Sequence, residues 1–77
     1  MSWDDELDAR GLLCPLPVLK ARKRLAALAP GQVLRLIATD PAAVIDVPHY
    51  CAESGHILRE TMDEADTQVY YIEHKAS

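Results

Sequence analysis

The sequence predicts an α+β domain: a two-layer sandwich in which two helices cover one face of a mixed four-stranded sheet, in the order β-α-β-α-β-β. Three observations support this fold class. Short segments with alternating or β-branched apolar residues occur near both ends of the chain, two segments with helical spacing lie between them, and a proline stands at the start of each helical segment. The 77 residues predict a single domain, 1–77, with a modest core and no deep pocket.

The spacing of apolar residues changes from every second residue to every third or fourth, which predicts a strand followed by a helix. Leu7 and Ala9 alternate with polar neighbours, which predicts a short strand that ends at Gly11. Residues 15–28 predict a helix, which Pro30-Gly31 would end. Its expected buried stripe has 3-4 spacing and consists of Val18, Ala21, Leu25 and Leu28.

The remaining strands are predicted from β-branched and aliphatic residues. Residues 33–39 form one strand, with Leu34, Leu36 and Ala38 expected on a shared inward face. His56–Thr61 and Val69–His74 predict an antiparallel hairpin around a polar turn at Met62–Gln68.

The second helix is predicted between Asp40 and Gly55. Asp40 is the expected N-cap with Pro41 as the first helical residue, and Gly55 is the expected left-handed terminator. Pro48 should divide this segment into a turn at 41–46 and a helix at 47–54. The predicted buried stripe contains Val44, Val47 and Cys51.

Charge limits the classes of partner. The net charge is −4, yet half of the lysines and arginines form one basic cluster on the first helix: Lys20, Arg22, Lys23 and Arg24. Such a cluster can be a solvated face or a docking face for acidic partners. The negative net charge and the lack of nearby aromatic residues argue against direct nucleic-acid binding. No apolar run is long enough for a membrane span and the acidic start is no secretory signal, so we expect a cytoplasmic protein, monomeric when free.

The most informative segment is Gly11-Leu12-Leu13-Cys14-Pro15-Leu16-Pro17, which places Cys14 at or just before a helix start. Two registers are possible: Cys14 is the N-cap with Pro15 at N1, or Leu16 is the cap with Pro17 at N1. In both, the helix dipole should lower the pKa of the Cys14 thiol and favour the nucleophilic thiolate. Gly11, Pro15 and Pro17 should fix the direction of the sulfur.

Other roles for the cysteines are less consistent with the spacing. Pro17 stands where a dithiol oxidoreductase has its second cysteine, so sulfur added to Cys14 could persist as a persulfide. A Cys14–Cys51 disulfide is not expected in the cytoplasm, and Cys51 should be a buried core thiol. His49, Cys51 and His56 do not have a metal-binding spacing, so we expect no metal and no cofactor. The alternative for Cys14 itself is an inert cysteine at a helix start.

These motifs resemble the TusA/SirA-like sulfur-carrier family, with its Cys-Pro-x-Pro signature. The likeness covers nearly the whole chain, and only the apolar position taken by Glu73 and a glycine in the turn at 62–68 are missing. It implies a βαβαββ fold and a cysteine, here Cys14, that takes up persulfide sulfur and passes it on. The matching segments are Leu7 to Pro17, Pro30-Gly31, Thr39-Asp40-Pro41, Asp46-Val47-Pro48, Tyr50-Cys51 and Gly55-His56.

We therefore predict a sulfur carrier whose sulfurtransferase-type chemistry needs partner proteins. The family implies a donor such as a cysteine desulfurase and an acceptor protein in tRNA thiolation, sulfur oxidation, molybdenum cofactor maturation or thiosulfate use. Leu19, Arg22, Lys23 and Asp40 are the candidate docking residues. The alternative is a non-catalytic regulatory module that docks through its basic first helix, and a third, less favoured possibility is a small nucleic-acid binder.

Overall fold

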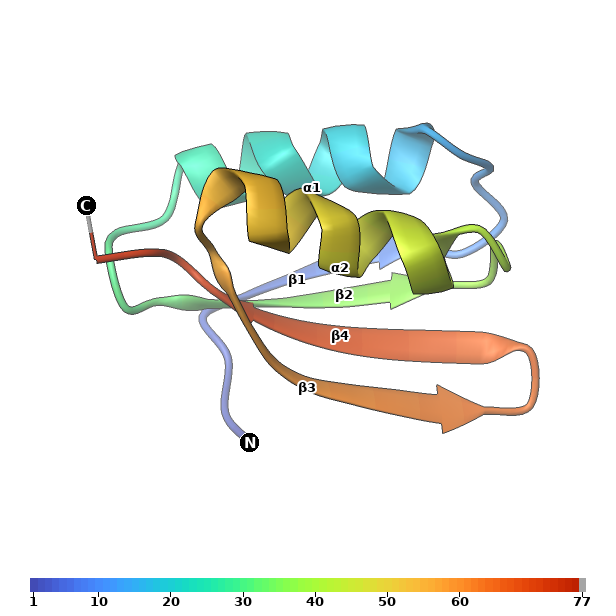
Figure 1. Ribbon diagram of the computed structural model, residues 1–77. Helices are drawn as coiled ribbons and strands as arrows, with labels where there is room; N and C mark the ends of the chain where they lie inside the picture. Colours follow the sequence, from blue (N-terminus) through green and yellow to red (C-terminus); the bar gives the residue numbers. More distant parts are fainter. Residues whose placement is uncertain (77) are drawn as a thin grey trace.

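A computed structural model describes residues 1–76 and has the predicted fold class: two helices lie side by side on one face of a mixed four-stranded sheet (Figure 1). The strand order in the sheet is β1-β2-β4-β3. The elements are β1 (Asp5–Ala9), α1 (Leu16–Ala26), β2 (Val33–Ala38), α2 (Ala43–Ser54), β3 (Ile57–Glu64) and β4 (Thr67–Glu73).

The pairing of β1 with β2 determines where the loops lie. These two strands are parallel, and Ala9 pairs with Ala38 at their carboxyl ends. Parallel neighbours end at the same edge of a sheet, so the loop that precedes α1 lies beside the loop that precedes α2. The antiparallel strand β4 then pairs with β2, and β3 forms the outer edge.

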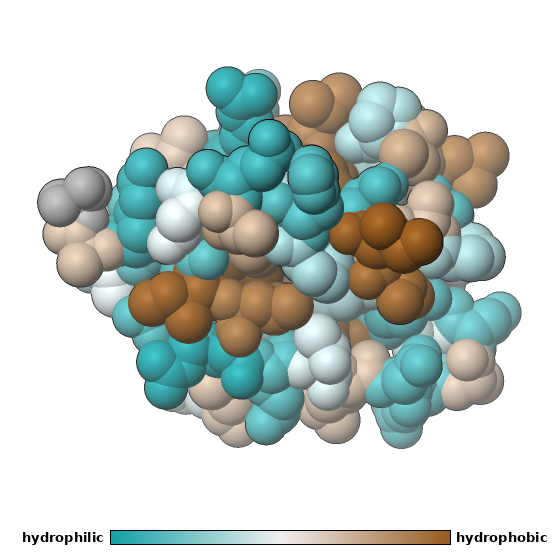
Figure 2. Space-filling view, in the orientation of Figure 1, coloured by the Kyte–Doolittle hydropathy of each residue, from teal (hydrophilic) through white to brown (hydrophobic). Residues whose placement is uncertain are grey.

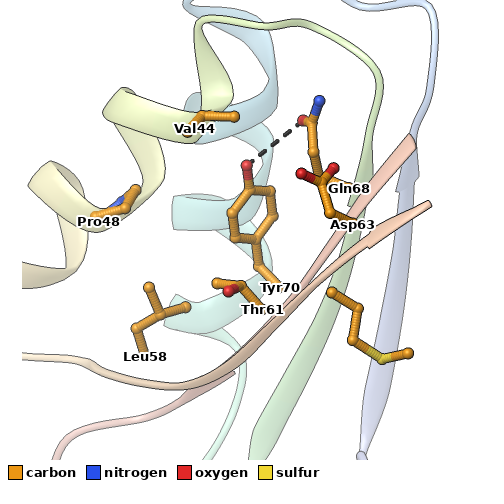
Figure 3. A pocket seen from close by; sticks show the side chains of 8 residues that line it. Val44, Pro48, Leu58, Thr61, Asp63, Gln68 and Tyr70 are labelled. Atoms are coloured by element: carbon orange, nitrogen blue, oxygen red, sulfur yellow. Dashed lines mark hydrogen bonds between the residues drawn. The ribbon is translucent and has the colours of Figure 1, made fainter. Parts of the chain in front are cut away.

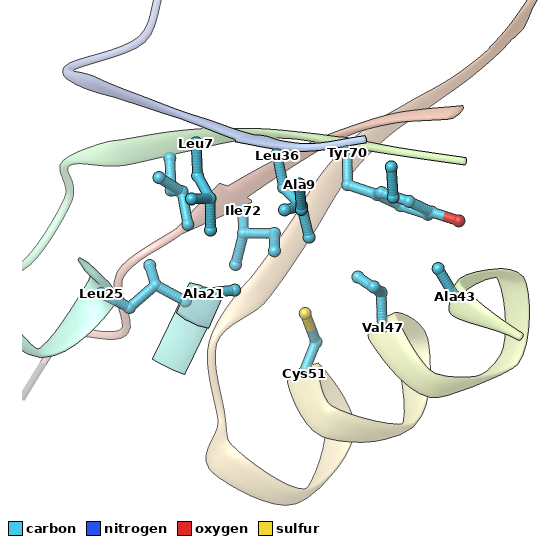
Figure 4. Packing of buried hydrophobic residues seen from close by; sticks show 12 residues of the cluster. Leu7, Ala9, Ala21, Leu25, Leu36, Ala43, Val47, Cys51, Tyr70 and Ile72 are labelled. Carbon is cyan, nitrogen blue, oxygen red and sulfur yellow. The ribbon is translucent and has the colours of Figure 1, made fainter. Parts of the chain in front are cut away.

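The core lies between the sheet and the helices (Figure 4). The predicted inward faces of β1 and β2 are confirmed, because all five of their side chains are buried: Leu7, Ala9, Leu34, Leu36 and Ala38. In α1 the buried residues are Pro17, Ala21 and Leu25, whereas the predicted stripe members Val18 and Leu28 are only half-buried. The fully buried stripe thus has a spacing of four residues and begins at Pro17, and Val18 and Leu28 pack against the edge of the core.

The second helix differs from its prediction in three respects. It is continuous from Ala43 to Ser54 although it contains Pro48, and its N-cap is Ala42 rather than Asp40. Its buried stripe is Ala43, Val47 and Cys51, so Cys51 is confirmed as a core residue but Val44 is 53% exposed. A proline costs one helical hydrogen bond. Packing of the buried stripe compensates, while the Pro48 ring lies on the exposed flank beside it. Gly55, with φ of 87°, ends the helix as predicted.

The final hairpin is longer than its sequence suggests. The predicted turn at Met62–Gln68 is wrong, because only Ala65 and Asp66 connect β3 to β4. Ala65 takes the left-handed conformation, φ 55°, that glycine usually adopts in such turns. The pairing of β3 with β4 shifts register between Leu58 and Glu60. The alternation of inward and outward side chains is interrupted there, so the sequence of β3 does not have the regular pattern of a strand.

The sheet face away from the helices carries charged residues of β1, β2 and β4, among them Glu6, Arg35 and Glu73. Glu73 lies on this face, where it pairs with Arg59 at 3.0 Å, while its neighbour Ile72 is fully buried beneath the helices. Arg35 lies 4.8 Å from the centre of the Trp3 ring and pairs with Glu6 at 2.6 Å. In the part of the chain that the structure describes, no helix is long and apolar enough to cross a bilayer.

Candidate functional site

Cys14 lies on an exposed loop whose backbone is attached to the end of β2. The Gly11 amide donates a hydrogen bond to Oγ1 of Thr39 at 2.8 Å, and the Cys14 amide donates to Oδ2 of Asp40. Gly11 has a φ of 81°, which the tight turn after β1 requires. The loop is therefore held at both ends by the residues that follow the neighbouring parallel strand.

Asp40 joins the two loops of the site. Its other carboxylate oxygen, Oδ1, accepts a hydrogen bond from the Ala42 amide at 3.1 Å, just before α2 begins. Asp40 thus stabilises the turn that leads into α2 without being the helix N-cap. The residue is only 8% exposed, and both of its oxygens accept backbone amides. The sequence pattern located this carboxylate but not its bond to the Cys14 loop.

The start of α1 follows neither predicted register. Pro15 is the N-cap, so Leu16 is the first helical residue and Pro17 the second. Cys14 stands one residue before the cap, on the loop. The Leu16 amide donates to the Leu13 carbonyl at 2.9 Å, and Pro17 has no amide hydrogen, so the helix start offers the sulfur few free N–H groups.

A shallow groove of about 230 Å³ runs between the Cys14 loop and α2. Its walls are Cys14, Pro15 and Val18 on one side and one stripe of α2 on the other: Asp46, His49, Tyr50 and Glu53. Sequence reasoning gave no site role to this stripe. Its spacing of three and four residues was a possible signal, because it marks one helix face next to the buried one.

Acidic neighbours reverse the expected electrostatics of Cys14. A hydrogen bond from the thiol to the Asp46 carboxylate raises the pKa of Cys14, and desolvation and the negative charges of Asp46 and Asp40 act in the same direction. The prediction of a lowered pKa is therefore wrong. The dipole of α1 is only one influence on the sulfur, and the charged groups beside it come from α2 and from the residues that follow β2.

The second cysteine has a different environment. Cys51 is 4% exposed, and burial raises its pKa to about 11. Both cysteines are free thiols. Among residues 1–76, no three metal-binding side chains lie close enough together to hold an ion.

The predicted docking residues lie on different sides of α1. Leu19 is 50% exposed, and Arg22 lines a groove of about 440 Å³ together with Tyr50, Glu53 and His56. Lys23 faces the other flank, beside Lys20 and Arg24. Arg24 is bound to Asp5 at 3.3 Å, so the basic cluster is not one uniform face.

Comparison with known proteins gives a consistent result. The profile of the family described as Sulfurtransferase TusA matches residues 5–74. The Sulfur carrier protein TusA of Pseudomonas aeruginosa strain UCBPP-PA14 is 47% identical over 75 residues, which cover 97% of this chain and 95% of the relative. That of Allochromatium vinosum is 50% identical over 62 residues, 80% of this chain and 82% of the relative. The crystal structure of a SirA-like protein from Desulfitobacterium hafniense superposes with a TM-score of 0.82 at 23% identity, covering 94% of this chain and 99% of that chain, which bears on the fold alone.

Proposed function

The chain belongs to the TusA family of sulfur carriers, and on this premise we propose that Cys14 carries the sulfur as a persulfide. The observation that supports this assignment most is the contrast between the two thiols: Cys14 is exposed and Cys51 is buried. An exposed sulfur on a backbone that Thr39 and Asp40 hold in place can meet the cysteine of a partner protein.

The proposed loading step exchanges one sulfur atom without net oxidation. The Cys14 sulfur attacks the outer sulfur of a donor persulfide, a new S–S bond forms, and the bond within the donor persulfide breaks. The products are the Cys14 persulfide and the donor thiol. The proton that leaves Cys14 passes to the departing donor thiolate, and the Asp46 carboxylate, which lines the same groove, is placed to hold it on the way. Unloading repeats the exchange with an acceptor thiolate.

A cysteine desulfurase is the donor class we propose, because it presents sulfur as a persulfide on its own cysteine. The acceptor is a second protein with a reactive thiol. Routes open to such a carrier are tRNA thiolation, sulfur oxidation, molybdenum cofactor maturation and thiosulfate use.

Docking of the donor is proposed on the flank of α1 nearest the sulfur. Leu19 offers exposed apolar surface there, and Arg22 offers positive charge without an ion-pair partner among the described residues. Lys23 is a second cation without such a partner, on the other flank of the helix, where it can steer an acidic donor by charge. We assign Asp40 a positioning role instead, because its carboxylate is buried and occupied by two amides.

Incubation with a cysteine desulfurase and cysteine tests the proposal. Intact-mass analysis should reveal a gain of one sulfur, about 32 Da, that a reductant removes. The gain should be absent in Cys14→Ser and retained in the matched control Cys51→Ser. Loading that survives in Cys14→Ser would contradict the assignment. A regulatory module that docks through α1 instead predicts that Cys14→Ser keeps full activity in cells.

A further inference from the structure

A second groove, of about 320 Å³, lies between α2 and the β3–β4 hairpin (Figure 3). Val44 and Pro48 form its helix wall, and Leu58 and Thr61 form its strand wall. Val44 and Pro48 are four residues apart and occupy one flank of α2. The stripe that faces Cys14 begins at Asp46, half a turn away, so the two grooves lie on opposite flanks of the helix.

The floor of this groove is polar and ordered. The Tyr70 side chain points from β4 toward Gln68, and its hydroxyl donates to Oε1 of Gln68 at 3.4 Å (Figure 3). Tyr70 is 3% exposed and Gln68 is 9% exposed. Burial raises the pKa of Tyr70, and the negative charge of the Asp63 carboxylate, which also lines the groove, acts in the same direction. Apolar walls with a few polar groups are typical of a recognition pocket.

Charge around the groove is of one sign. Asp63 lines it, and Glu64 and Asp66 follow within the same hairpin. None of these three carboxylates takes part in an ion pair within residues 1–76, and no lysine or arginine lines the groove. The lysines and arginines without such a partner in the described chain are Lys20, Arg22 and Lys23 on α1, and Lys75 after β4.

Apolar surface continues outward from the helix wall. Val44 is 53% exposed and its neighbour Ile45 is 74% exposed. Figure 2 shows strongly hydrophobic residues gathered over the first turn of α2 on this face of the molecule. Large apolar side chains side by side at a surface mark interaction sites more often than isolated ones do.

We propose that this groove is a second protein-docking surface, which takes an apolar side chain flanked by lysine or arginine residues of a partner. The apolar side chain lies between Val44, Pro48 and Leu58, and a flanking cation faces Asp63. The surface is opposite in charge to the free cations of α1, so the protein can distinguish two partners by charge. This inference goes beyond the proposed function and holds whether or not Cys14 carries sulfur.

Nuclear magnetic resonance titration of the ¹⁵N-labelled protein tests the proposal with three synthetic pentapeptides. The probe is acetyl-Lys-Lys-Leu-Lys-Lys-amide, and the controls replace its leucine by serine or its lysines by glutamates. The leucine–lysine peptide should shift the amide signals of Val44, Thr61 and Tyr70. The serine peptide should bind about tenfold more weakly because it buries less apolar surface, and the glutamate peptide should leave the groove signals in place.

Protein variants separate the groove from the general charge of the hairpin. Asp63→Asn should weaken binding of the leucine–lysine peptide about two- to fivefold, the range of an exposed ion pair. Asp66→Asn removes the same charge outside the groove lining and should change the affinity less. Val44→Ser alters an exposed wall residue, so it should weaken binding without unfolding the protein. Equal shifts with the serine peptide, or shifts that map away from the groove, would overturn the proposal.

Discussion

Replacement of Asp40 by asparagine should loosen the Cys14 loop and lower the stability of the domain. In the native protein the two oxygens of Asp40 accept the amides of Cys14 and Ala42. An asparagine has one acceptor oxygen, so one of these amides must lose its partner. Because the side chain is 8% exposed, water is poorly placed to compensate.

The size of the effect follows from that lost bond. A hydrogen bond to a charged group contributes about 1.5–3 kcal/mol, and a small domain of this length has a total stability of roughly 4–12 kcal/mol. The variant should therefore lose about 1.5–3 kcal/mol and melt roughly 6–24 °C lower than the wild type. Asp66→Asn is the matched control, since Asp66 is exposed in the β3–β4 turn and should change stability by less than about 0.5 kcal/mol.

Thermal denaturation and hydrogen exchange together check this prediction. The Cys14 amide should exchange faster in Asp40→Asn even well below the melting temperature, because its acceptor is lost or shared. A variant that melts with the wild type and protects the Cys14 amide equally well would refute the positioning role of Asp40.

Three further outcomes concern the thiols and the basic helix. Asp46→Asn removes a negative charge beside the sulfur, so Cys14 should react with iodoacetamide about fivefold faster at neutral pH. Mass spectrometry measures the alkylation rate, and an unchanged rate would contradict the prediction. Arg22→Glu/Lys23→Glu should melt normally but load sulfur more slowly at low ionic strength, as high salt does to the wild type. Loading at the wild-type rate would mean that these two cations are merely solvated. Burial raises the pKa of Cys51 from 9.0 to about 11, so the thiol of the unfolded chain loses its proton at a lower pH than the thiol of the folded chain. The free energy of unfolding should therefore be constant below about pH 9 and fall as the pH rises from 9 to 11. Urea denaturation at several pH values should reveal this loss, on the order of 2 kcal/mol, in the wild type and not in Cys51→Ala.

The alternation of apolar and polar residues was enough to predict the strands in which every second side chain is buried. Leu7 and Ala9 alternate in β1, and Leu34, Leu36 and Ala38 alternate in β2, so their inward faces could be predicted directly. The hairpin could not, because its strands extend through polar residues near the turn, and backbone pairing there does not need an apolar side chain. Ala65 takes a glycine-like conformation that its residue type does not indicate.

In α2, one feature could be predicted from neighbouring residues in the sequence and two could not. Gly55 marks its end by a local requirement for positive φ. Pro48 suggested a break, yet packing of Val47 and Cys51 against the sheet keeps the helix continuous. The sequence pattern placed Val44 in the buried stripe, but its neighbour Ala43 is buried instead. Contact with the sheet decides between these two adjacent positions. Tertiary packing thus overrides propensity where the two disagree.

The same distinction explains why Cys14 could be predicted and its electrostatic environment could not. The flanking prolines and Gly11 are local signals for a presented residue, and they identify the loop. The groups that act on the sulfur, Asp40 and Asp46, are 26 and 32 residues away in the chain, and they reach it only when α2 packs beside α1.

These acidic neighbours give the proposed carrier a dependence on its partners. A thiol whose pKa is raised by Asp46 is mostly protonated at rest, and a protonated thiol is a poor nucleophile toward peroxides and stray disulfides. A donor that brings positive charge to the groove between Cys14 and α2 would compete for the Asp46 carboxylate and favour the thiolate. Reactivity would then rise only in the docked complex. An arginine or lysine of the donor placed near Asp46 is therefore the feature to look for in a complex, and docking that leaves the Cys14 alkylation rate unchanged would rule this mode of activation out.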